Sequence, residues 1–289
     1  MGVLYIDKPK GITSFDVCFK LRKILNTKKI GHTGTLDPNA TGVMIVLYNN
    51  ATKANQFLVS DTKEYIGTCL LGIETDSLDI DGKIIKEEKL KMPTQEKLTD
   101  VFKTFIGHYK QTPPLTSAIR VNGKRLYEYQ RENIEVKVEA RDVQIYELEL
   151  LEIKDNLFTF RCLVSSGTYI RSLLKDILDK MSLFGCLSDL RRTKINDVDI
   201  SDCDTLDNVL NGKYKEHSLF DILSRRYEVY ITDNPKSIMD GKRIQIDSNA
   251  DKVLVCDSNN TCLAIYHKDK DEYSCVRGLL WLKNILLMI

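Results

Sequence analysis

The chain has 289 residues, of which 43% are hydrophobic and 29% charged, and its 15 glycines and 6 prolines are close to average usage. These values exclude low-complexity and fibrous chains, and the length allows one large domain plus a small one. Because 42 Lys and Arg residues nearly balance 41 Asp and Glu residues, for a net charge of +1, the composition excludes a uniformly basic coat for nucleic acid. A locally basic groove remains compatible with it.

The N-terminal half alternates strand and helix patterns with polar connections. Thr13 and Asp16 predict a capped helix start, because Asp16 stands where a capping box has Glu. Residues 31–42 read as a polar loop punctuated by glycine, and residues 74–88 as an acidic connection with six carboxylates against two lysines. Apolar runs predict strands over 3–6, 43–48 and 64–71, and helices over 51–58 and from Thr94.

The C-terminal half begins with a basic, loop-rich stretch at 111–141. Tyr146, Leu148 and Leu150 alternate with glutamates, which predicts a half-buried strand. Another strand is expected at 158–164 and a helix at 168–181. Beyond a boundary near 223–228, short β-like runs at 229–231, 243–246, 253–256 and 262–266 favour a small β-barrel. Without regular βαβ alternation, the whole favours an α+β fold.

Targeting and metal-binding patterns are weak. The N-terminus lacks a signal-peptide pattern, Ile6 stands where myristoylation wants Ser or Thr, and the apolar stretch 278–289 is too short to span a bilayer. We therefore expect a soluble, intracellular protein. The eight cysteines include no Cys-x-x-Cys pair and the four histidines are scattered. This pattern favours reduced cysteines in the core and predicts no metal site.

The most unusual segment is the loop at 29–43, in which three glycines permit tight turns around Asp37. From the residues alone, Asp37 could be a turn or capping residue or a catalytic carboxylate. His32 could be a ligand, a stacking platform or a solvated turn residue. The chain has no dinucleotide-binding, Walker A, zinc-protease or serine-hydrolase motif, so no cofactor is expected.

The loop Gly31–Gly42 closely resembles the catalytic motif of the TruB family of tRNA pseudouridine synthases. The resemblance continues in order from about residue 3 to residue 195, and its most specific parts surround Asp37 and Arg171. The other matching segments are Asp7–Ser14, Lys63–Tyr65, Thr75–Ser77, Asp79–Gly82, Gln111–Pro114, Gly123–Tyr129, Ser166–Arg171 and Leu190–Arg192. One segment, Pro113–Arg120, departs from the family: Thr116 replaces an aromatic residue and Arg120 a lysine.

The resemblance implies a pseudouridine synthase fold at 1–225, with an RNA-gripping insertion at about 111–141, and a PUA-like domain at 226–289. It assigns the nucleophile to Asp37, and Arg171 as the cation that keeps this carboxylate ionised in a dry pocket. Attack at C1′, attack on the base and a glycal route stay open. Tyr65 resembles the tyrosine that stacks on the uracil, and it could also accept the C5 proton.

Further roles also follow from the resemblance. His32 would fill the space left by the flipped base, Lys8 would brace the catalytic loop, and Leu190 would form an apolar wall. Within the other matching segments, Tyr169 and Asp76 are expected to contact the substrate.

Local positive charge agrees with RNA binding: four cations face one glutamate in 120–131, and seven face three aspartates in 161–194. In the insertion, the expected RNA-binding cations are Arg120, Lys124 and Arg125. The substrate implied is uridine 55 in the T-arm of tRNA, handled by a monomer without a protein partner. The alternatives are a synthase acting on another RNA, a tRNA-folding chaperone, and a glycosidic hydrolase that would release uracil.

Overall fold

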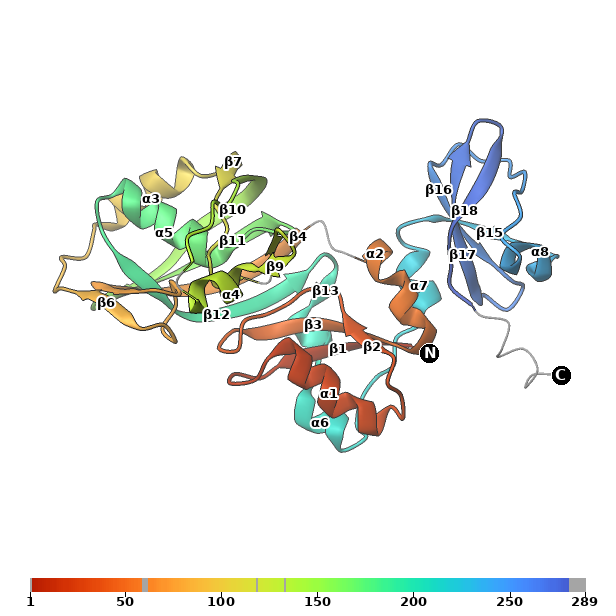
Figure 1. Ribbon diagram of the computed structural model, residues 1–289, viewed down its shortest axis with the longest axis horizontal. Helices are drawn as coiled ribbons and strands as arrows, with labels where there is room; N and C mark the ends of the chain where they lie inside the picture. Colours follow the sequence, from red (N-terminus) through yellow and green to blue (C-terminus); the bar gives the residue numbers. More distant parts are fainter. Residues whose placement is uncertain (1, 59–61, 118, 133, 281–289) are drawn as a thin grey trace.

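The computed structural model describes residues 2–58, 62–117, 119–132 and 134–280. In Figure 1 the chain forms a large sheet with helices on it, and a smaller sheet at one end of the long axis. The apolar stretch expected at 278–289 lies largely outside the described residues. No helix among the described residues is long and apolar enough to cross a bilayer.

The large sheet carries the site described below. Its strands are β1 (Gly2–Lys8), β2 (Ile30–His32), β3 (Thr41–Tyr48), β4 (Thr62–Leu71), β7 (Gly107–Gln111), β10 (Arg141–Lys154), β11 (Leu157–Ser165), β12 (Gly185–Ile195), β13 (Val198–Asp199) and β14 (Asp204–Thr205). The strand order is β14-β1-β3-β12-β4-β11-β10-β7, with β2 beside β3 and β13 beside β12. The pairs β3–β12 and β1–β14 are parallel and the others antiparallel, as expected of an α+β fold.

Short helices and two hairpins complete this part of the chain. The helices are α1 (Ser14–Ile24), α2 (Asn55–Leu58), α3 (Gln95–Lys103), α4 (Leu126–Arg131), α5 (Ile170–Lys180), α6 (Leu206–Leu210) and α7 (Leu219–Leu223), with 3₁₀ turns η1 (Asn49–Ala54) and η2 (Ile200–Asp202). The hairpins are β5 (Ile73–Thr75) with β6 (Ile84–Glu87), and β8 (Arg120–Val121) with β9 (Lys124–Arg125). The predicted capping box is confirmed: Asp16 N–H donates to Thr13 Oγ1, and Thr13 N–H to Asp16 Oδ2.

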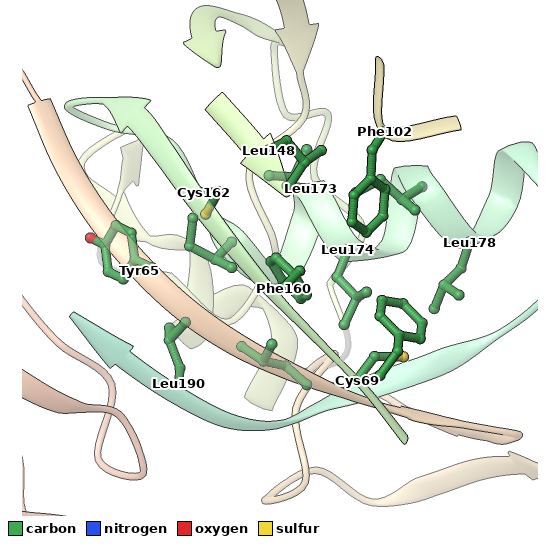
Figure 2. Close-up of a cluster of buried hydrophobic side chains, with 14 of the residues drawn as sticks. Tyr65, Cys69, Phe102, Leu148, Phe160, Cys162, Leu173, Leu174, Leu178 and Leu190 are labelled. Atoms are coloured by element: carbon green, nitrogen blue, oxygen red, sulfur yellow. The ribbon is translucent and has the colours of Figure 1, made fainter. Parts of the chain in front are cut away.

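The core beneath the site lies between the sheet and helices α3 and α5. Ile177 and Leu178 on α5 lie three and four residues after Leu174, so the three side chains share the helix face that packs on the sheet. Figure 2 shows Tyr65 and Leu190 at one end of this cluster and Phe102 and Leu178 at the other. The apolar cluster thereby supports the side chains that line the site.

The structure corrects several expectations. Tyr146 is exposed, because a β-bulge between Ile145 and Glu147 shifts the alternation and Ile145 faces the core instead. The loop expected at 31–42 is shorter, since β2 includes His32 and β3 begins at Thr41. The helix expected at 51–58 is divided, because residues 51–54 belong to the 3₁₀ turn η1 and only residues 55–58 form the short α2.

The charged segment Gly185–Ile195 carried no strand prediction, yet it is the central strand β12. It tolerates arginines there because their side chains bond within the protein. Arg192 is fully buried and donates to backbone carbonyls, and Arg191 pairs with Asp7 at 2.7 Å.

The small sheet contains β15 (Glu228–Ile231), β16 (Lys252–Cys256), β17 (Cys262–Asp269) and β18 (Glu272–Gly278), and α8 (Pro235–Met239) follows β15. The predicted strand at 243–246 is only an isolated bridge between Ile244 and Tyr273. Leu254 and Ile265 in this sheet share one buried cluster with Val3 and Ile45 in the large sheet. The two sheets are therefore joined by a common core, and the division at residues 225/226 stays a prediction.

All eight cysteines are free, and six of them are buried, in agreement with the expected core role. Among the residues that the structure describes, no three or more His, Cys, Asp or Glu side chains gather as a metal site would require.

Candidate active site

Asp37 lies on the loop between β2 and β3, and two buried cations donate hydrogen bonds to backbone carbonyls of this loop. Lys8 at the end of β1 is 0% exposed, and its ammonium donates to the carbonyls of Pro9 (2.9 Å), Pro38 (3.1 Å) and Ala40 (2.7 Å). Burial lowers the pKa of Lys8 to about 8, while Asp37 opposes the shift. Two of the three acceptors, the carbonyls of Pro38 and Ala40, belong to the loop just after Asp37, which is the contact that the expected bracing role requires.

Two further residues fix the loop. Arg192 on β12 donates to the carbonyls of Gly34 (3.1 Å), Thr35 (3.3 Å) and Val43 (2.7 Å). Gly42 has a positive φ of 107°, and a Cβ there would lie 2.1 Å from the Arg192 carbonyl oxygen. Only glycine therefore allows β3 to approach β12 at this point.

The predicted Asp37–Arg171 pair is present. Arg171, in the first turn of α5, places its Nη2 3.0 Å from Asp37 Oδ2. The Arg171 side chain is 5% exposed and the Asp37 side chain 42% exposed. The Asp37 carboxylate is thus partly exposed to solvent. The dry pocket expected around it would form only when a bound substrate covers this exposed part.

The other nitrogen of Arg171 is held by three groups. Nη1 donates to the carbonyl of Ser77 (2.9 Å) and to Thr116 Oγ1 (2.5 Å), and it lies 3.4 Å from Asp79 Oδ2. Burial raises the pKa of Asp79, and Arg171 opposes this shift. The guanidinium is therefore oriented from the side opposite Asp37 and does not use both nitrogens on Asp37, as a bidentate pair would.

Sequence reasoning assigned no role to Asp79 or Thr116. Asp79 belongs to an acidic segment that resembles the family, and that was its only signal. Thr116 is the residue that replaces the family's aromatic side chain, and the structure gives it a contact with Arg171 through both its hydroxyl and its carbonyl (3.1 Å).

A cavity of about 450 Å³ opens beside the ion pair, a volume in the range of small-ligand sites. We call it the Asp37 pocket. Tyr65 on β4 and Leu190 on β12 line it, and they are 6% and 9% exposed. Burial raises the pKa of Tyr65, so its phenol is protonated near neutral pH. Both residues therefore lie where a stacking surface and an apolar wall would be needed, and these two roles stay predictions.

Lys63 also lines the Asp37 pocket, and sequence reasoning gave it no role. It lies two residues before Tyr65 on β4, so both side chains leave the same face of the strand. Burial, followed by the nearby Arg192, lowers the pKa of Lys63 to about 8. With this pKa the Lys63 side chain is still largely protonated at pH 7, so it adds a positive charge to the lining of the Asp37 pocket.

On the other side of the Asp37 loop lies a second hollow of about 460 Å³. His32, Arg120 and Arg125 line it together with Phe15 and Pro38. Burial lowers the pKa of His32, so its ring is neutral near pH 7. His32 and two of the three expected RNA-binding cations thus share one hollow.

The remaining predicted residues have varied positions. Tyr169 lines the Asp37 pocket, and its N–H donates to Gln111 Oε1 at 2.7 Å. Lys124 pairs with Glu132 and lies 5.0 Å from the centre of the Tyr129 ring. Asp76 accepts the Lys83 N–H (2.9 Å) in the β5–β6 connection. The substrate contacts expected of Tyr169, Lys124 and Asp76 stay predictions.

Two solved structures share the fold of this chain. The structure superposes with TM-score 0.71 and 23% identity on a crystal structure of a Cbf5-Nop10-Gar1 complex, covering 96% of this chain and 85% of that chain. An H/ACA RNP bound to a substrate RNA containing 2′-deoxyuridine gives TM-score 0.71 at 21% identity, covering 98% and 86%. At these identities the likeness concerns the fold.

Sequence comparison identifies the family. The model of the TruB family pseudouridylate synthase N-terminal domain matches residues 22–170. The chain is 39% identical over 285 residues to tRNA pseudouridine synthase B of Lactobacillus acidophilus, covering 94% of this chain and 96% of that protein. The protein of the same name in Mesoplasma florum is 35% identical over 280 residues, covering 96% and 97%. The chain belongs to the TruB family, and it is accordingly an enzyme of pseudouridine formation.

Proposed function

We propose that this enzyme isomerises uridine 55 in the T-arm of tRNA, with Asp37 as its catalytic carboxylate. The observation that carries the proposal is the Asp37–Arg171 pair, 3.0 Å apart, beside a pocket lined by Tyr65. The relatives named tRNA pseudouridine synthase B support tRNA as the substrate.

The proposed reaction needs a carboxylate but no oxidation or reduction. The C1′–N1 bond breaks, the uracil turns, and C1′ bonds to C5; the C5 proton leaves and N1 gains a proton. A carboxylate suits chemistry at a glycosidic carbon. Attack of Asp37 at C1′, attack on the base, and a glycal route remain alternatives within this proposal.

The pocket also has to receive a base that has left its stack. Tyr65 provides a ring face, and Leu190 excludes water beside it. The protonated phenol of Tyr65 favours the stacking role over that of a proton acceptor. Arg120 and Arg125 on the neighbouring surface supply charge for the RNA backbone.

The experiment is incubation of unmodified tRNA transcript with wild-type enzyme and Asp37→Asn, without added metal or nucleotide. Asp37→Asn keeps the shape of the side chain but removes its charge. We expect wild-type enzyme to convert uridine 55 and Asp37→Asn to bind tRNA without conversion, by site-resolved pseudouridine mapping. Asp100→Asn, at an exposed position of α3, is the matched control and should retain activity.

The outcomes separate the alternatives. Conversion by Asp37→Asn would remove this residue from catalysis. Conversion at a different uridine would overturn the T-arm assignment, and release of free uracil would indicate a hydrolase.

A further inference from the structure

A surface outside the Asp37 pocket has the chemistry of an RNA-binding face. We propose that Phe15, Phe19 and Arg22 of α1, here called the α1 face, stack against unpaired substrate bases next to the target nucleotide. This inference rests on the proposed function, because it concerns how the same RNA is held.

The α1 face turns away from the core. Phe15, Phe19 and Arg22 are four and then three residues apart, so they share one side of the helix. The opposite side, which includes Val17 and Leu21, is fully buried. Phe15 is 62% exposed and Phe19 61% exposed, so neither ring serves the core.

The two rings and the cation form one unit. The Arg22 guanidinium carbon lies 5.6 Å from the centre of each ring. The Nε of Arg22 is buried and has no hydrogen-bond partner among the described residues. An arginine held between two exposed rings offers both π-faces and donors, as single-stranded RNA requires.

The α1 face is continuous with the active site. Ser14 Oγ accepts the Leu36 N–H (2.8 Å) and donates to the Leu36 carbonyl (3.0 Å). The first residue of α1 is thereby tied to the loop residue that precedes Asp37. Phe15 then lines the second hollow together with His32 and Arg120. RNA whose target base enters the Asp37 pocket would therefore pass the α1 face.

The surrounding charge complements a nucleic acid. From the start of α1 to β2, Lys20, Lys23, Lys28 and Lys29 are exposed and add to Arg22. The carboxylate within this stretch, Asp16, is engaged by Thr13 at 2.9 Å. Positive charge around exposed rings favours RNA as the occupant over an apolar protein partner.

The test measures tRNA binding in the Asp37→Asn background, where we expect no turnover. Phe15→Ala and Phe19→Ala should each raise Kd about tenfold, in keeping with the loss of one base–ring stack. Phe15→Tyr keeps a ring and should bind like the parent. Leu151→Ala is the matched control, because it removes an exposed apolar side chain outside α1. Leu151 lies near the C-terminal end of β10, where this strand pairs with the start of β11.

Two further measurements separate stacking from a general loss of structure. Fluorescent 2-aminopurine at unpaired positions beside the target uridine should be quenched by the parent and not by the Phe15→Ala/Phe19→Ala double variant. With Asp37 restored, the double variant should keep kcat at saturating tRNA and show a raised KM. A general defect would instead lower kcat.

The results distinguish the two proposals. If the enzyme converts uridine 55 but the double variant binds tRNA within twofold of the parent, the α1 face proposal is wrong and the proposed function stands. If wild-type enzyme binds the transcript through these rings without converting it, the proposed function is wrong and the α1 face proposal stands. Absence of any binding would overturn both.

Discussion

The Arg171 guanidinium is oriented toward the Asp37 carboxylate by several separate contacts. Its Nη2 reaches Asp37, while Nη1 is held by Ser77, Thr116 and Asp79. An arginine presents donors in a rigid plane, so fixing one edge also fixes the direction of the other. Thr116 therefore acts on Asp37 through Arg171, in a segment where the chain departs from its family.

This arrangement predicts that Thr116→Val lowers kcat about tenfold with little change in KM. Valine keeps the shape but removes a hydroxyl that accepts a hydrogen bond from a charged donor, an interaction worth about 1.5–3 kcal/mol. Steady-state kinetics with a tRNA transcript would check this. Thr104→Val, at the C-terminal end of α3, is the control. An unchanged kcat for Thr116→Val would show that Ser77 and Asp79 orient Arg171 sufficiently.

At the scale of elements, α5 combines the site with the core. Arg171 at its start faces Asp37, while Leu173, Leu174 and Leu178 anchor the helix on the sheet. Asp176 lies partly buried on the same helix. Burial raises the pKa of Asp176 from 3.8 to about 6, with Lys175 opposing and Asp179 adding to the shift.

The raised pKa predicts that Asp176→Asn stabilises the protein at pH 8. Between about pH 6 and 4 the Asp176 carboxyl is protonated in the folded state but ionised in the unfolded state. The partly buried carboxylate therefore lowers the free energy of unfolding by its full amount above this pH window and by nothing below it. We expect Asp176→Asn to raise the free energy of unfolding by about 1 kcal/mol at pH 8. This value is smaller than the pKa difference alone would give, because the side chain is partly exposed to solvent. The gain should vanish by about pH 4.

Urea unfolding at several pH values measures this effect. Asp142→Asn on the exposed part of β10 is the control, with no expected change. A gain for Asp176→Asn that grows as the pH falls would contradict the sign of the argument.

For the whole molecule, the shared cluster between the two sheets has the largest consequence. Leu254 on β16 is fully buried, in a cluster that also contains Val3 and Ile45 of the large sheet. Its neighbour Val255 points to the other side, into the small sheet's own cluster. A core shared in this way couples the unfolding of the two parts.

We therefore expect Leu254→Ala to lower the free energy of unfolding of the whole chain by about 3 kcal/mol, the usual cost of a large cavity in a core. Calorimetry should show one transition, shifted to lower temperature. Ile231→Ala, at a 44% exposed position of β15, should leave it unchanged. Two separate transitions would show instead that the parts unfold independently.

Local pattern was sufficient for many of the longer elements. The Thr13–Asp16 cap and the apolar stripe of α5 were predictable because capping and helical spacing act within a few residues. The resemblance around Asp37 and Arg171 indicated the family. The exposed Tyr146 was not predictable, because a bulge in the pairing of β10 with β11 sets the face of each side chain.

What the sequence by itself determined is the inventory of the site: a loop with Asp37, a helix start with Arg171, and a strand with Tyr65. Tertiary structure alone decided that charged β12 lies at the centre of the sheet, that Arg192 is buried beneath the loop, and that Thr116 touches Arg171. The reason is physical, since a buried arginine is stable only where distant backbone carbonyls converge on it. That convergence exists only after the chain has folded.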